Sequence, residues 1–293
     1  NDSLWLADPQ RREDYGYRAI HEMTVKAKAI IDAYYGSGPD YSYFNGCSTG
    51  GRQGLMEAQR YPQDYHGIVA AAPAINWNRF HIQHLWGPVA MNAAGNPVAP
   101  CKLAAATAAA IAACDTIDGV QDGVIEDPVR CPYDPKPLIG TSAGDCGTFT
   151  AADAEIVRQL WNGPRRTDGT FLWYGLPRGA DLSAIWSSRG EPLRPVPFGI
   201  SMDWFRYFLT QDPDFDGNAV SPALFERYWD QSVEQYGIVF GTDDPDLTAF
   251  RDRGGKAIVW HGWADAIVVV TAHRSIDWAS VYDRAGLVVD TVD

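Results

Sequence analysis

One short segment constrains the fold more than any other, because it places a serine between two glycines at Gly46-Cys47-Ser48-Thr49-Gly50. An aromatic, β-prone run precedes it at 41–44, and a helix-forming run follows at 53–60. A strand that turns directly into a helix is the setting of a nucleophile elbow, which holds a serine hydroxyl clear of the sheet. We expect both glycines to be needed there, because a side chain at either position would collide with strained backbone. Ser48 is therefore the candidate nucleophile.

The segments around the elbow alternate between helical and strand patterns. Apolar residues recur at helical spacing over 14–35 and stop at Gly36, which is typical of a helix end. The apolar run 67–73 suits a buried parallel strand, and 256–260 is a second one rich in β-branched residues. Further elements are expected as a strand at 41–45, helices at 51–61 and 271–284, and an approach to a strand at 286–289. The fold class is therefore α/β, with sequential strands joined by helices.

The middle of the chain follows a different pattern. An alanine-rich helix is expected at 103–113, and an acidic segment with glycines and cysteines comes after it. Residues 130–200 hold many prolines, glycines and tryptophans with little periodicity. We therefore predict a catalytic domain in two pieces, 1–77 and 246–293, with an inserted lid domain at 78–245. Most of the aromatic side chains of that insert are expected in its core: Trp161, Trp173, Trp186, Trp204, Phe205 and Tyr207.

Charge and hydropathy exclude several classes of partner. The net charge of −13 argues against nucleic acid or an anionic membrane surface. We find no unbroken apolar run near the roughly 20 residues that a membrane helix needs. No signal peptide stands at Asn1, and the chain begins in mid-pattern, so we expect residues to be missing there.

Four of the five cysteines lie between positions 101 and 146. Such a cluster in a loop-rich segment is typical of disulfides in an exported protein. Zinc is the alternative, but the segment has no Cys-x-x-Cys and no histidine. The odd count leaves one thiol over.

Several long motifs, in the same order, resemble the tannase/feruloyl esterase family. The first block includes Asp14-Tyr15-Gly16-Tyr17-Arg18-Ala19, Gly46-Cys47-Ser48-Thr49-Gly50-Gly51-Arg52, Glu57-Ala58-Gln59-Arg60-Tyr61-Pro62 and Ala72-Pro73-Ala74. The others are Cys114-Asp115-Thr116-Ile117-Asp118-Gly119-Val120-Gln121-Asp122-Gly123, Asp246-Leu247-Thr248-Ala249-Phe250, Gly254-Gly255-Lys256 and His261-Gly262-Trp263-Ala264-Asp265. The resemblance implies an α/β-hydrolase fold with a large inserted lid domain.

The resemblance also implies a Ser-Asp-His triad that is incomplete here. Ser48 would be the nucleophile, Asp265 the acid, and the N–H of Thr49 one oxyanion donor. The family's histidine stands in a Gly-His-Cys motif beyond the aspartate, and its cysteine pairs with the one beside the serine. His273 fits no such motif, and His261 precedes the aspartate, so we interpret His261 as structural. No Gly-Gly run stands before Ser48 to give the second oxyanion donor. We therefore expect the hydrolase domain in this chain to be incomplete at both ends.

The family's lid carries a calcium loop, and the matching oxygen ligands here are Asp115, Asp118, Val120, Asp122 and Val124. The ion would be Ca²⁺ in a structural role. We expect Cys114 to pair with Cys131 and Cys101 with Cys146, while pairing of Cys101 with Cys114 and of Cys131 with Cys146 stays an alternative. Cys47 would be unpaired in this chain and disulfide-bonded in the whole enzyme.

These motifs predict a carboxylic ester hydrolase that acts on small esters of aromatic acids, such as feruloyl or galloyl esters, through an acyl-enzyme on Ser48. Trp77 is the candidate substrate-binding aromatic. A catalytically inactive hydrolase-fold binding protein is the alternative, and cleavage of peptides or thioesters is a third possibility. We expect a secreted or periplasmic protein without nucleic-acid or membrane partners.

Overall fold

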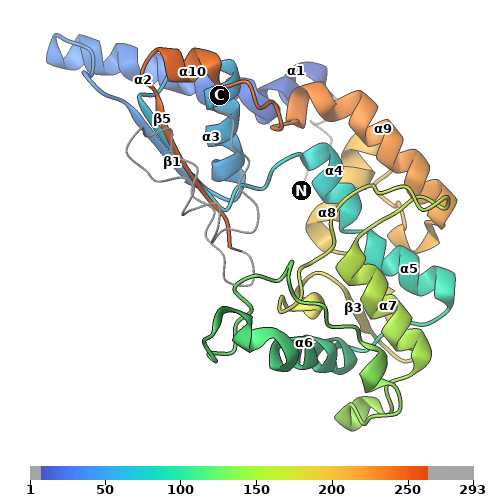
Figure 1. Cartoon of the computed structure of the whole chain (residues 1–293). Coiled ribbons are helices and arrows are strands. Elements are labelled where there is room, and N and C mark those ends of the chain that lie inside the picture. The colour runs from blue at the N-terminus through green and yellow to red at the C-terminus, as the bar shows by residue number, and fades with distance from the viewer. Residues whose placement is uncertain (1–7, 263–293) are drawn as a thin grey trace. The chain divides into compact units, whose positions relative to one another are not determined.

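The structure is a computed structural model that describes residues 8–262, and these residues form two compact units (Figure 1). Unit 1 comprises residues 8–77 and 236–262, and unit 2 comprises residues 78–235. Unit 1 is thus built from two separate stretches of the chain. Sequence analysis places the second boundary at residue 245 instead of 235.

Unit 1 is organised around a parallel three-stranded sheet. Its strands β1 (Tyr43–Cys47), β2 (Gly67–Ala71) and β5 (Lys256–Trp260) lie in the order β1-β2-β5. The register aligns Cys47 with Ala71 and Ala71 with Trp260, so the carboxyl ends of all three strands meet at one edge. Ser48 and His261 both follow directly at this edge. The expected α/β arrangement with parallel strands is confirmed for this part of the chain.

Helices of unit 1 cover one face of the sheet. Helix α3 packs on β1 and β2, and Ala58, Ile68 and Phe250 are buried between these layers. The helices of the unit are α1 (Pro9–Glu13), η2 (Asp14–Arg18), α2 (Ala19–Tyr35), α3 (Thr49–Arg60) and α10 (Thr248–Asp252). The helix expected at 14–35 begins with a π-helical turn at η2 and ends, as predicted, at Gly36, whose φ is +78°. The described strand β2 ends at Ala71, two residues earlier than expected.

Unit 2 is mainly helical and has its own core. Trp161, Trp186, Trp204 and Phe205 are buried in it, as expected for the aromatics of the insert. Its main elements are α4 (Trp77–Gln83), α5 (Trp86–Ala94), α6 (Pro100–Cys114), α7 (Ala151–Asn162), α8 (Gly199–Asp203), η7 (Trp204–Leu209), α9 (Pro222–Phe240) and the antiparallel pair β3 (Ser187–Arg189) and β4 (Arg194–Val196). Helix α4 starts at the last residue of the first stretch of unit 1, and the unit boundary at 235 falls within α9.

Helix α7 lies in a stretch where sequence analysis reports little periodicity. Thr150 and Asp153 form a capping box at its start, with both reciprocal hydrogen bonds present. Ile156, Val157 and Leu160 then line its buried face. The capping pattern was the local signal that could have identified this helix.

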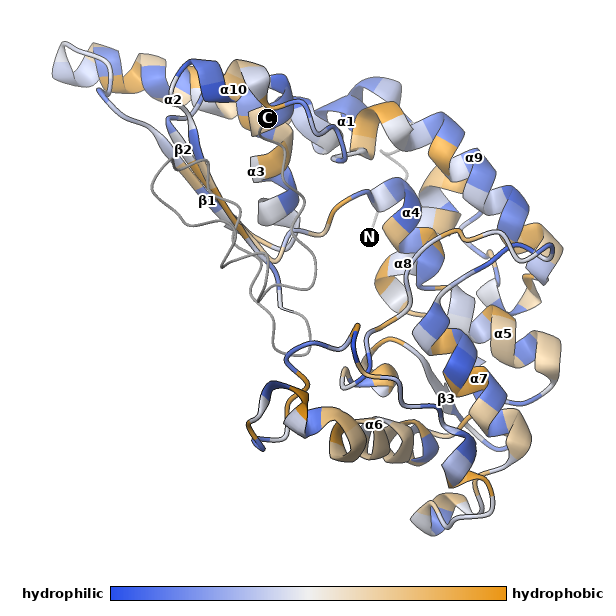
Figure 2. Cartoon of the chain, in the orientation of Figure 1, coloured by the Kyte–Doolittle hydropathy of each residue, from blue (hydrophilic) through white to orange (hydrophobic). Residues whose placement is uncertain are grey.

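Helix α6 is apolar over most of its surface (Figure 2). With the turn that follows, 100–118 is the one described segment long and apolar enough to cross a membrane by length and composition, at a mean hydropathy of 1.2. The segment contains Lys102, Asp115 and Asp118, so it is not an unbroken apolar run. Leu103, Ala106 and Ala110 are fully buried, so one side of α6 packs in unit 2, although only 28% of the segment is buried.

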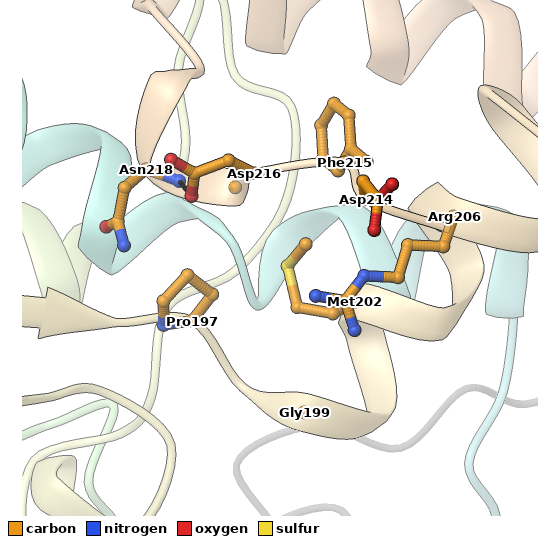
Figure 3. A pocket seen from close by; sticks show the side chains of 9 residues that line it. Pro197, Gly199, Met202, Arg206, Asp214, Phe215, Asp216 and Asn218 are labelled. Atoms are coloured by element: carbon orange, nitrogen blue, oxygen red, sulfur yellow. Dashed lines mark hydrogen bonds between the residues drawn. The ribbon is translucent and has the colours of Figure 1, made fainter. Parts of the chain in front are cut away.

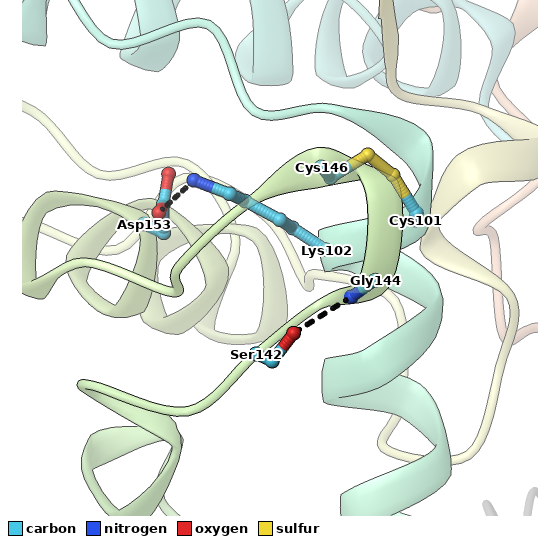
Figure 4. The surroundings of a disulfide bond; sticks show 6 residues. All are labelled: Cys101, Lys102, Ser142, Gly144, Cys146 and Asp153. Atoms are coloured by element: carbon cyan, nitrogen blue, oxygen red, sulfur yellow. Dashed lines mark hydrogen bonds and ion pairs between the residues drawn. A yellow bond between two sulfur atoms is a disulfide. The ribbon is translucent and has the colours of Figure 1, made fainter.

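Two disulfides hold α6 at its ends. Cys101 is bonded to Cys146 and Cys114 to Cys131, with Cα–Cα distances of 6.2 and 5.5 Å. These are the pairs that sequence analysis favours over the alternative. Beside the first bridge, Lys102 forms a 2.6 Å ion pair with Asp153 (Figure 4). The amino end of α6 is thereby tied to the start of α7.

Candidate active site

Ser48 stands between the end of β1 and the start of α3 in a rare backbone conformation. Its φ is +58° and its ψ is −113°, in a region that non-glycine residues seldom adopt. A serine before a helix ordinarily caps the first turn with its hydroxyl. Ser48 makes no such capping bond, and it is exposed. The strained turn therefore presents the hydroxyl outward, as a nucleophile elbow does.

Hydrogen bonds of its own backbone fix Ser48 in this conformation. Its N–H donates to the carbonyl of Ala71 at 3.0 Å, which joins it to β2. Its carbonyl accepts from the N–H groups of Arg52 at 3.0 Å and Ala74 at 3.1 Å. The serine is thus held by the sheet, by its helix and by the loop after β2.

Glycines allow the close approach of the chain at this turn. A Cβ at Gly46 would lie 2.5 Å from the carbonyl carbon of Gly50, and one at Gly51 would lie 2.5 Å from the carbonyl oxygen of Ala71. A Cβ at Gly50 would meet nothing within 4 Å. The expectation that both flanking glycines avoid a collision is therefore right for Gly46 and wrong for Gly50. The second crowded position is Gly51, where α3 passes close to the end of β2.

Of the other predicted catalytic groups, only Thr49 lies within the described residues. Thr49 is the first residue of α3, so its N–H has no acceptor within the helix, and its part as an oxyanion donor stays a prediction. Asp265 and His273 fall outside the described residues. Among the histidines that are described, none hydrogen-bonds to Ser48, and the Nδ1 of His261 lies 2.9 Å from the Gly262 carbonyl oxygen.

A serine–histidine pair that sequence analysis did not single out lies in unit 2. The Nδ1 of His84 is 2.7 Å from the Oγ of Ser201. Both side chains are buried, and burial lowers the pKa of His84 to about 4. The imidazole is therefore neutral near pH 7, but substrate has no access to the serine. We interpret this pair as part of the core of unit 2.

Trp77 is buried against other side chains of unit 1. Its ring stacks on Phe240 at 5.9 Å between centroids, and the guanidinium carbon of Arg52 lies 4.4 Å from its centroid. A cavity of about 300 Å³ lies in unit 2, where Met202, Arg206 and Phe215 line it together with Asp214, Asp216 and Asn218 (Figure 3). None of the predicted site residues lines this cavity. A substrate contact by Trp77 stays a prediction.

Cys47 is a free, exposed thiol next to the candidate nucleophile Ser48. The four cysteines of unit 2 pair with one another, so none of them reaches it.

The predicted calcium loop follows α6 directly. Asp115 is mostly buried and accepts from the N–H groups of Asp122 and Gly123 at 3.2 and 2.9 Å. Asp118 and Asp122 accept from the N–H groups two residues on. Hard oxygen donors on a curled loop suit calcium by their chemistry. In the described part of the chain, however, no three acidic, histidine or cysteine side chains converge as a metal site.

Comparisons with known proteins agree with the geometry of the elbow. Residues 1–288 match the family described as tannase and feruloyl esterase. A probable feruloyl esterase from Arthroderma benhamiae is 38% identical over 262 residues, which are 87% of this chain and 49% of that protein. A probable feruloyl esterase B-2 from Aspergillus terreus is 33% identical over 97% of this chain and 53% of its own length.

Solved structures give the same result. Tannin acyl hydrolase from Aspergillus niger matches with a TM-score of 0.79 at 26% identity, covering 88% of this chain and 50% of that one. Feruloyl esterase B from Aspergillus oryzae matches with a TM-score of 0.72 at 30% identity, covering 85% and 49%. The chain therefore spans about half the length of the relatives that it matches. With the family match over residues 1–288 and the elbow at Ser48, the chain belongs to the tannase and feruloyl esterase family.

Proposed function

We propose that the protein is a serine carboxylester hydrolase that cleaves small esters of aromatic acids through an acyl-enzyme on Ser48. The observation on which this rests is the exposed, non-capping Ser48 at φ +58° between a parallel strand and a helix. The relatives' names, which include feruloyl esterases and a tannin acyl hydrolase, support esters of phenolic acids as the substrate class.

The proposed reaction has two steps. The Oγ of Ser48 attacks the ester carbonyl as a histidine takes its proton, and the alcohol leaves with that proton. Water then attacks the acyl-enzyme, gives a proton to the histidine, and releases the aromatic acid and free Ser48. In this proposal Asp265 orients the histidine, which comes from outside the described residues.

The oxyanion of each step forms beside the start of α3. The N–H of Thr49 would donate to it, and the positive end of the helix dipole adds to the stabilisation. A second donor would again come from outside the described residues. We further propose that Cys47 pairs with a cysteine beside the catalytic histidine in the complete protein, which would fix the distance between base and nucleophile.

We propose an oxidising compartment, secreted or periplasmic, as the site of action. The two disulfides of unit 2 support this, because such bridges persist mainly in exported proteins. The lid role of unit 2 is likewise part of this proposal.

The test is the replacement Ser48→Ala in the complete protein, assayed on methyl ferulate and on a galloyl ester. We expect turnover to fall by about three orders of magnitude or more, with an unchanged melting temperature. Ser201→Ala is the matched control. It removes the hydroxyl of the buried pair of Ser201 and His84 in unit 2, and it should leave most of the turnover. An active Ser48→Ala protein would overturn the proposal. An inactive wild-type protein that binds phenolic esters would favour the binding-protein alternative.

A further inference from the structure

Arg52 is a charged residue in an unusual place. It stands in the first turns of α3, four residues after Ser48, and its side chain is fully buried, with 0% exposed. Arginine is almost never fully buried in proteins unless a counter-ion pairs with it. Among the described residues no aspartate or glutamate forms an ion pair with Arg52. The burial of Arg52 is therefore explained neither by surface solubility nor by a surface ion pair.

Main-chain carbonyls and aromatic faces take the place of a counter-ion. The Nη1 of Arg52 donates to the carbonyl of Gly16 at 2.8 Å, and Nη2 lies 3.5 Å from the carbonyl of Tyr15. The guanidinium carbon lies 4.4 Å from the centroid of the Trp77 ring and 5.9 Å from that of Phe240. These distances are within the range of cation–π attraction. Burial lowers the pKa of Arg52 to about 10, so the side chain is still charged at neutral pH.

These contacts join the start of α3 to three separate stretches of unit 1. Tyr15 and Gly16 belong to η2, Trp77 follows the loop after β2, and Phe240 ends α9. Arg52 stands one helical turn after Ser48, so its backbone belongs to the turn that begins at the serine. The N–H of Arg52 also donates to the carbonyl of Ser48 at 3.0 Å. A shift of Arg52 would therefore be passed directly to the serine and to the N–H of Thr49.

We propose that Arg52 is a positioning residue for the nucleophile: its buried guanidinium locks the first turn of α3 to η2 and Trp77, and this lock sets the place of Ser48 and Thr49. The inference rests on the proposed function, since it assigns Arg52 a part in the chemistry of that same site. It also gives Trp77 a role, which is to cover the guanidinium with its ring.

The test compares three variants in the complete protein: Arg52→Gln, Arg52→Lys and Arg60→Gln. Arg60 is the matched control because it is the last residue of the same helix. Its guanidinium lies 4.3 Å from the Tyr17 ring centroid and also donates to a main-chain carbonyl, that of Ile238. At 1.5 Å per residue it is about 18 Å from Ser48 along the helix. Arg60→Gln therefore removes contacts with a ring and a main-chain carbonyl from the far end of the helix, where the side chain is exposed, without disturbing the elbow.

We expect kcat of Arg52→Gln to fall about 100-fold with little change in KM, because a misplacement of about 1 Å costs that much in an aligned site. Labelling of Ser48 by a fluorophosphonate should slow in parallel. Arg52→Lys keeps a cation near the same carbonyls but loses the two-pronged guanidinium, so it should keep about a tenth of the wild-type kcat. Arg60→Gln changes an exposed side chain, so it should lower the melting temperature less and leave kcat within about twofold.

A purely structural role would give a different result. If Arg52→Gln keeps wild-type kcat and labelling at a temperature where it is folded, whatever its melting temperature, the inference is wrong. If Arg52→Gln does not fold, Arg52→Lys is the deciding variant. It lacks the two-pronged guanidinium, so wild-type kcat and wild-type labelling in it would also overturn the inference. Failure of the proposed function is distinguishable, because wild-type protein would then not be labelled at Ser48 at all.

Discussion

Helix α3 carries a second buried ionisable residue, Glu57, which stands five residues after Arg52. Only 1% of its side chain is exposed. Burial, with the nearby Asp64 carboxylate as the second cause, raises the pKa of Glu57 to about 8, whereas its ordinary value is 4.5. Asp64 is itself 2.7 Å from the Nδ1 of His21 on α2. A neutral Glu57 at this junction therefore favours the packing of α2 against α3.

This predicts a pH dependence of stability with a definite sign. Because the folded pKa lies above the unfolded one, the contribution of Glu57 is complete below about pH 4.5 and is lost as the pH rises through about 8. The free energy of unfolding should fall with pH across this window, by at most about 1.4 kcal/mol per pH unit from one group. Urea unfolding of wild type and Glu57→Gln between pH 5 and 8 checks it. Parallel pH profiles for the two proteins would contradict the prediction.

At the scale of elements, α6 and the loop after it form one stapled unit. The bridge between Cys114 and Cys131 closes the loop that holds Asp115, Asp118 and Asp122. We propose that one Ca²⁺ binds there, with the carbonyls of Val120 and Val124 as further ligands at about 2.3–2.6 Å. The carboxylates would have to turn toward the ion and give up the hydrogen bonds that they now accept from backbone N–H groups.

Calcium titration by calorimetry, with the melting temperature in calcium and in chelator, checks this site. We expect one ion per chain and a melting temperature that rises with calcium, because a ligand that binds only the folded state stabilises it. Asp118→Asn should weaken binding. Asp127→Asn, which changes an aspartate of the same disulfide loop outside the proposed ligand set, should not. An ordered loop that stays empty in a crystal grown in calcium would refute the proposal.

For the molecule as a whole, we propose that residues 1–293 supply Ser48 as nucleophile but not its base, since no described histidine hydrogen-bonds to Ser48 and His273 fits no family motif. A protein of residues 1–293 alone should therefore turn over methyl ferulate far more slowly than the complete enzyme, since oxyanion donors without a base leave only residual catalysis. Steady-state assays of the two forms at equal concentration check this. Comparable turnover by the two would contradict the interpretation and make His273 the candidate base.

The local features of this fold can be predicted from the sequence alone. The strand, turn and helix around Ser48, the stop of α2 at Gly36 and the α/β alternation all follow from residues close together in the chain. Each depends on backbone preference and short-range spacing. Those are properties that a stretch of sequence contains in full. The disulfide pairs came with one alternative open, because spacing alone cannot decide between partners.

Crowding at a glycine, burial of a charge and a shifted pKa depend on residues far apart in the sequence, and only the three-dimensional structure shows them. Gly51 needs to be glycine because β2 passes beside it, and Gly50 does not, although both look alike in the motif. Arg52 is buried because η2, Trp77 and α9 meet over it, and Glu57 is raised in pKa because Asp64 lies against it. Burial and charge are set by neighbours that the fold brings together, and no local pattern in the sequence identifies those neighbours.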